Sequence, residues 1–79
     1  MYKLYEYVEP IVDDREGTIE PTTMKYIADA NGNVHYTNLN NMGWEAVEYV
    51  TLSLISVNLT FNGDMSKKEV EEMVFLDVI

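Results

Sequence analysis

Two groups of carboxylates are the residues best suited to chemistry in this chain. One group lies in the segment DDREGTIE, between positions 13 and 20, and the other lies near the C-terminus. Clustered carboxylates either bind hard cations such as Ca²⁺ or meet the basic surface of another macromolecule. The residues concerned are Asp13, Asp14, Glu16, Glu20, Glu69, Glu71 and Glu72.

The spacing of the first group excludes a calcium-binding loop of the EF-hand type. Such a loop has glycine at its sixth position and an oxygen ligand at its first. With Gly17 in the sixth position, Val12 would take the first, and its side chain has no ligand atom. Segment 29–33 also fails, because Gly32 comes too early. We expect no metal and no cofactor, with a weak adventitious cation site within 13–16 as the alternative.

His35 is the only histidine and therefore the best candidate for a general base. Acyl transfer needs a nucleophile, a base and a group that orients the base, and no serine lies near His35 in the sequence. The two Asn-Gly pairs are turn sequences, not a glycine-rich phosphate loop. We predict that the protein is not an enzyme and that His35 is an ordinary, partly exposed histidine.

The charge balance narrows the class of partner. Fourteen acidic residues oppose five basic ones, which gives a formal net charge of −9 in 79 residues. Such a surface repels nucleic acid and anionic lipid and attracts basic surfaces. Six tyrosines are present, but the basic stripe that nucleic-acid binding requires is missing. We predict a protein partner with a basic surface and no direct contact with nucleic acid or membrane; acidity that serves solubility alone is the alternative.

Cysteine content and hydropathy indicate the cellular compartment in which the protein is expected. Without cysteine, the chain has no disulfide and no thiolate ligand. Its N-terminus, MYKLYEYVEP, lacks the basic segment and apolar run of a signal peptide. The longest mostly apolar stretch, VTLSLISVNLTF, is too short to span a bilayer as a helix. We expect a cytoplasmic protein with a single domain, 1–79.

The elements that must position these groups are mostly strands. Tyr2–Val12 is rich in Tyr and Val and predicts a strand with apolar side chains on both faces. The charged segment Asp13–Pro21 connects it to a second strand, expected over Met24–Asp29. Ala30–Asn33 predicts a tight turn, because Asn and Gly tolerate positive φ. Val34–Tyr36 is expected to pair back as a short strand.

The central segment, NLNNMGWEAVEYV, is expected to contain the joint between a helix and a strand. A short helix is predicted over Asn38–Met42, with Gly43 as its C-terminal stop. Trp44 is expected to be a core anchor rather than a binding platform, because one indole buries a large area. A long strand is expected over Glu45–Phe61, and its length predicts a bend or a bulge near Ser53.

The C-terminal segment fits two structures. The Ser66–Glu69 spacing is that of a capping box and predicts a helix to about Met73. The Asn62-Gly63 pair, followed by alternating residues, instead predicts a hairpin into a last strand, which we favour. The chain is thus expected to be an α+β domain, with a small antiparallel sheet of four to five strands and one short helix packed on one face.

Leu4–Val8 (LYEYV), Leu39–Val47 (LNNMGWEAV) and Val74-Phe75 form three short motifs. Together they resemble a family of small bacterial and phage domains of unknown function. That family opens with a YEY-type strand and continues to a pattern like L-N-x-x-G-x-x-G-W-E-L-V, which is shortened here. Segment 13–34 has no counterpart, and the basic residues that the family often has after the Val-Phe pair are missing. The resemblance implies a small sheet with a covering helix and no particular functional residues.

Two hypotheses of function follow. In the first, the protein is a non-enzymatic inhibitor whose carboxylates imitate a phosphate backbone and occupy a basic surface built for nucleic acid. Phage-encoded inhibitors of host defence nucleases have this small, acidic, cysteine-free composition, so anti-CRISPR-type action is its most concrete form. In the second, it is a small-ligand-binding or structural homo-oligomeric domain, in which tyrosines and Trp44 line a pocket between protomers. Apolar groups on both faces of the sheet favour a second layer such as a homodimer.

Overall fold

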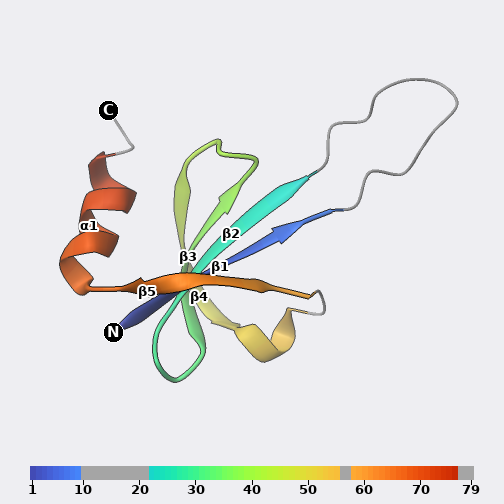
Figure 1. The fold of residues 1–79 in the computed structure, drawn as a ribbon, viewed down its shortest axis with the longest axis horizontal. Helices are drawn as coiled ribbons and strands as arrows, with labels where there is room; N and C mark the ends of the chain where they lie inside the picture. The colour runs from blue at the N-terminus through green and yellow to red at the C-terminus, as the bar shows by residue number, and fades with distance from the viewer. Residues whose placement is uncertain (10–21, 56–57, 77–79) are drawn as a thin grey trace, which may run out of the picture.

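The computed structural model describes residues 1–9, 22–55 and 58–76 (Figure 1). These residues form one five-stranded antiparallel sheet, in the strand order β4-β3-β2-β1-β5, and one short helix that follows it. The first four strands succeed one another across the sheet, and β5 pairs with β1 at the opposite edge. The predicted α+β class is therefore confirmed. The elements are β1 (Tyr2–Val8), β2 (Thr23–Ala28), β3 (Asn33–Leu39), β4 (Trp44–Thr51), β5 (Thr60–Met65) and α1 (Lys67–Leu76).

The core lies between α1 and one face of the sheet. Ile27 on the central strand β2 is the register partner of Leu4 on β1 and of Tyr36 on β3, so the three side chains share that face. Val70 and Val74, four residues apart on α1, are buried against Ile27. The amphipathic spacing of the two valines therefore decides which side of the helix faces the sheet.

Trp44 packs against this same cluster, as expected of a core anchor. The helix in the cluster is α1, however, and not the predicted helix over Asn38–Met42, which is wrong. That segment contains the turn of the β3–β4 hairpin, in which Asn40 and Asn41 have φ of 51° and 58°. Two central residues with positive φ characterise a type I′ turn, whose twist matches the strands that it joins. Asparagine adopts this conformation more readily than most residues.

Gly43 closes this hairpin instead of ending a helix. It has a φ of 122°, and its N–H donates to the side-chain oxygen of Asn38 over 3.3 Å. Asn38 is buried, so this bond satisfies an acceptor that would otherwise be costly to leave unpaired. Glu45, the next residue after Trp44, is exposed, as expected for the start of a strand.

The single strand expected over Glu45–Phe61 is wrong, although its predicted bend is confirmed. β4 ends at Thr51, and a turn of 3₁₀ helix occupies Leu52–Leu54. The hydroxyl oxygens of Thr51 and Ser53 lie 2.9 Å apart. Local bonds of this kind compete with the hydrogen bonds of a ladder, which gives a physical reason for the strand to end here.

The C-terminal hairpin that the alternation favoured is also wrong, and the capping-box alternative is confirmed. The Glu69 N–H donates to the Ser66 hydroxyl, and the Ser66 N–H donates to the Glu69 carboxylate, each over 3.1 Å. Gly63 does not make a turn but lies within β5, with φ of 133°, where the register with β1 shifts. The Asn-Gly pair therefore marks a β-bulge.

Candidate interaction sites

Three of the seven carboxylates predicted to bind a partner lie on α1. Glu69, Glu71 and Glu72 are all exposed, because Val70 and Val74 turn the opposite side of the helix toward the sheet. Glu69 also has a structural role, since its carboxylate caps the helix. The other four predicted residues lie outside the described part of the chain: Asp13, Asp14, Glu16 and Glu20.

Within the described residues, no ion pair joins a carboxylate on the acidic side of α1 to a basic side chain. In those ranges the only ion pair joins His35 to Asp29, although Lys67 and Lys68 open the same helix. Glu71 and Glu72 are therefore exposed without a direct ion pair, although Lys67 and Lys68 lie four positions before them on the same helix. Exposed carboxylates without internal partners are available to a cationic surface.

Asp29 organises the turn between β2 and β3. One carboxylate oxygen accepts the N–H groups of Asn31 and Asn33, over 2.9 and 3.0 Å, and the other lies 2.9 Å from the His35 Nε2. The hydrogen bond to His35, followed by the bond from Asn33, lowers the Asp29 pKa from 3.8 to about 2. The tight turn expected at 30–33 is confirmed, and His35 is partly exposed as expected.

Acid is expected to weaken the fold through Asp29. Its folded pKa of about 2 lies below its ordinary value of 3.8, so the native state binds this proton less readily than the unfolded state does. The stabilisation is complete above about pH 4 and is lost as the pH falls toward 2. Thermal unfolding followed by circular dichroism should show that Asp29→Asn removes part of this acid-induced loss. Asp64→Asn, which removes an exposed carboxylate on β5, is the control; an equal effect in both variants would contradict the assignment.

The Asp29–His35 pair resembles two parts of a catalytic triad, in which a carboxylate orients an imidazole. In the described ranges, the ring of His35 makes no hydrogen bond to a hydroxyl group, and its other neighbour is the edge-to-face ring of Tyr2, with 5.4 Å between ring centroids. The Asp29–His35 pair therefore fixes the orientation of the imidazole ring within the fold.

The β3–β4 ladder contains a large bulge, which lies earlier in the chain than the bend or bulge expected near Ser53. Val34 pairs with Val50 and Tyr36 pairs with Ala46, so Val47–Tyr49 on β4 stand opposite His35 alone. The sequence of β4 keeps the alternation of a regular strand at Val47, Tyr49 and Thr51. This pattern therefore does not reveal where the pairing with β3 is interrupted. Bulges of this kind bend an edge strand and redirect its side chains.

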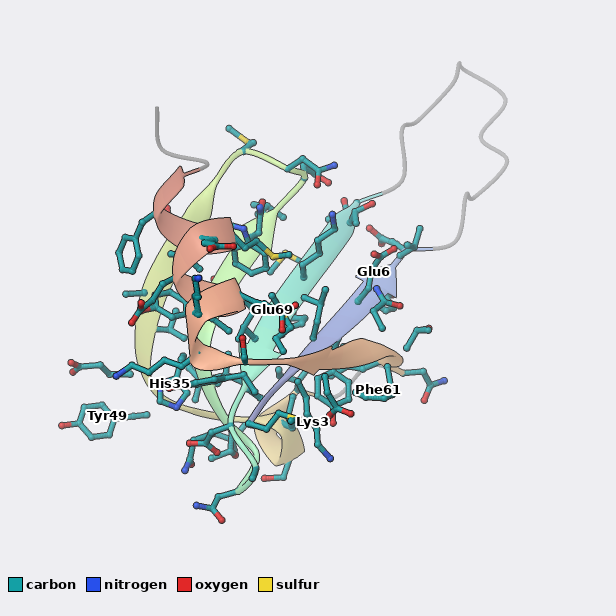
Figure 2. All side chains as sticks on the ribbon, turned by 60° about the vertical axis from the view of Figure 1, so that its left-hand side comes forward. Lys3, Glu6, His35, Tyr49, Phe61 and Glu69 are labelled. Carbon is teal, nitrogen blue, oxygen red and sulfur yellow. The ribbon has the colours of Figure 1, made fainter. Side chains whose placement is uncertain are left out.

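Tyr49 is the most unusual residue of the bulge. Its φ is 60°, which is rare for a bulky side chain, and the residue is 95% exposed. Figure 2 shows Tyr49 standing clear of the sheet, near His35. A backbone strain of this kind costs about 1–3 kcal/mol and is typical of functional sites.

A pocket of about 390 Å³ opens at this bulge. Its apolar wall is formed by three valines, of which Val34 is buried. Its polar side contains one acidic group, the exposed carboxylate of Glu48, together with one phenol, one amide and one imidazole. The lining residues are Asn33, Val34, His35, Val47, Glu48, Tyr49 and Val50.

The face of the sheet opposite the core cluster is rich in aromatic side chains. Tyr5 is the register partner of both Tyr26 and Phe61, and its ring lies 5.6 Å from that of Phe61. The ammonium of Lys3 lies 5.9 Å from the centre of the Phe61 ring. Burial raises the pKa of Tyr26. These side chains are only half-buried or exposed, so this face resembles a surface that a second layer could cover.

The described ranges contain neither a metal-binding cluster nor a helix that could span a membrane. No three His, Asp or Glu side chains in them are grouped as a metal ion requires. No helix in the same ranges is long and apolar enough to cross a membrane.

Comparison of the chain with protein-family models, with curated proteins and with solved structures finds no match in any of the three. The family resemblance suggested by the three short motifs therefore stays a prediction.

Proposed function

We propose that this is a non-enzymatic interaction protein that binds a basic, nucleic-acid-handling surface of another protein. In its most concrete form it is an inhibitor of the anti-CRISPR type, encoded by a phage or mobile element and acting in the host cytoplasm. The observation that carries the proposal is the exposed acidic side of α1, on a chain with a net charge of −9.

The geometry of α1 supports a charged docking surface. Glu69 and Glu72 lie three residues apart and so project from one side of the helix, with about 5–6 Å between their Cβ atoms. Glu71 widens this acidic surface, and the packing of Val70 and Val74 against the sheet fixes its direction. Because α1 is already packed on the sheet, its backbone loses no further entropy at a partner, although each exposed glutamate side chain still loses rotamer freedom on binding.

Ionic strength is the sharpest test of this proposal. The partner is first captured from host lysate and identified, and its affinity is then measured in isolation between about 0.05 and 0.5 M salt. Affinity should fall steeply over this range, since exposed charges are screened, and nucleic acid should compete with the protein for the partner. Binding that is insensitive to salt, or that coexists with bound nucleic acid, would contradict the proposal.

A second candidate function, favoured by the aromatic face, is a homo-oligomeric or small-ligand-binding domain. Apolar contacts across the face that contains Tyr5, Tyr26 and Phe61 would respond little to salt. Analytical ultracentrifugation separates the two functions: a dimer that persists at about 0.5 M salt and dissociates on Phe61→Ala substitution supports the second. In the proposed arrangement Trp44 contributes to the core of each protomer rather than to a pocket between them.

A further inference from the structure

We propose that the pocket at the β3–β4 bulge is an anchor site that receives an arginine side chain of the basic partner. This inference rests on the proposed function, because it assigns a specific contact to a partner whose surface is basic. It concerns a different part of the molecule from the acidic side of α1, so the two can be tested separately.

The pocket combines the groups that bind a guanidinium. Glu48 and Tyr49 are both lining residues: a carboxylate has two oxygen acceptors for the planar fork of donors, and an exposed tyrosine ring has a π face. The valines, among them Val47 and Val50, give the methylene groups of the side chain an apolar wall. Lysine lacks both the fork and the planar stacking surface, so arginine fits the pocket better.

The conformation of Tyr49 supports a role in recognition. The residue is 95% exposed, so the core does not explain why a bulky ring occupies a position with φ of 60°. Glycine or asparagine would adopt that φ with less strain. An exposed, strained aromatic residue beside a pocket is the arrangement expected of an interface anchor, since tyrosine and arginine are enriched among residues that dominate binding energy.

The electrostatics of the pocket favour a cation over an anion. Glu48 is its only carboxylate, and no lysine or arginine lines it. The Nε2 atom of the remaining titratable neighbour, His35, is engaged by Asp29 inside the fold. An anionic ligand would thus be repelled both by the carboxylate in the pocket and by the net negative charge of the protein. A guanidinium would be attracted by both.

The test uses the full chain, labelled with ¹⁵N, and two probes of equal charge, a hexa-arginine and a hexalysine peptide. Hexa-arginine should shift the amide signals of 33–35 and 47–50 and bind more tightly than hexalysine. Tyr49→Gly and Glu48→Gln should each weaken hexa-arginine about three- to tenfold and leave hexalysine nearly unchanged. Tyr49→Phe, which keeps the ring, should retain binding.

Two matched controls and a folding check accompany these variants. Glu45→Gln removes an exposed carboxylate from the same strand outside the pocket, and Met42→Ala removes an exposed apolar side chain from the β3–β4 turn, also outside the pocket. Both should change the affinity for hexa-arginine less than about twofold, within the range of near-neutral contacts. Tyr49→Gly suits the positive φ, so its spectrum and thermal midpoint should show an intact fold.

The outcomes separate the pocket from the proposed function. Salt-dependent binding of hexa-arginine that shifts only α1 signals, with no effect of Tyr49→Gly, would overturn the pocket and leave the proposed function standing. Shifts at the bulge that depend on Tyr49 and Glu48 but not on Glu71 and Glu72 would support the pocket and contradict the proposed function. Absence of binding by either peptide at low salt would overturn both.

Discussion

The Ile27→Ala variant is expected to unfold with a free energy about 2–5 kcal/mol lower than that of the wild type. Ile27 is the largest fully buried side chain in the described ranges, and it lies on the middle strand of the sheet. It joins Leu4 and Tyr36 on the neighbouring strands to the buried valines of α1. Loss of three carbon atoms at this point opens a cavity between sheet and helix.

The effect should be large relative to the total stability of so small a domain. At roughly 0.05–0.15 kcal/mol per residue, the whole chain has about 4–12 kcal/mol of stability. Urea denaturation followed by circular dichroism measures the difference. Leu54→Ala, which truncates an aliphatic side chain that is 70% exposed, is the control and should change stability by less than about 0.5 kcal/mol. Equal losses in the two variants would contradict the packing of α1 on the sheet.

Short-range patterns predicted the N-terminal half of the sheet well. Alternation of Tyr and Val places β1, and the Asn-Gly sequence after Asp29 places the β2–β3 turn, because both signals depend on residues close in sequence. The predicted short strand over Val34–Tyr36 was too short, since β3 continues to Leu39. The strand extends beyond Tyr36 because β3 pairs with β2 and β4. The sequence of β3 alone does not reveal this pairing.

Two predictions are wrong for the same physical reason, the helix over 38–42 and the C-terminal hairpin. In both segments, residues that favour turns fit more than one kind of element. Asn40 and Asn41 both adopt positive φ, so the segment beside Gly43 is a tight turn, although the same residues fit the end of a helix. Near the C-terminus, Asn62-Gly63 fits a turn but forms a bulge within β5. Alternation and helical spacing overlap in a short segment, and only the packing of Val70 and Val74 on Ile27 decides between them.

The candidate sites differ in how far the sequence predicts them. Net charge is visible in the composition, so the sequence indicates the acidic residues of α1 whether their segment forms a helix or a strand. The bulge pocket could not, because it depends on a mismatch of register between Val34 and Tyr36 on β3 and their partners on β4. A register shift is a property of two strands together and leaves the alternation of each strand almost unchanged.

Reversal of charge on α1 is expected to have the largest effect on partner binding. The double variant Glu71→Lys, Glu72→Lys should weaken binding about 10- to 100-fold and reduce the slope of affinity against salt. It raises the net charge from −9 to −5, because each substitution adds two units. Both side chains are exposed, so the fold should be retained. Glu69 is left unchanged, because its carboxylate accepts the Ser66 N–H, and its loss would also weaken the helix.

A control with the same net charge shows whether position or total charge matters. Glu9→Lys, Glu45→Lys makes the same change of four units at two exposed sites outside α1. If α1 is the docking surface, this variant should lose only long-range steering, a few-fold effect that appears mainly in the association rate. Equal losses in the two double variants would mean that total charge attracts the partner without a defined acidic face. No loss in either would exclude the acidic side of α1 as the docking surface.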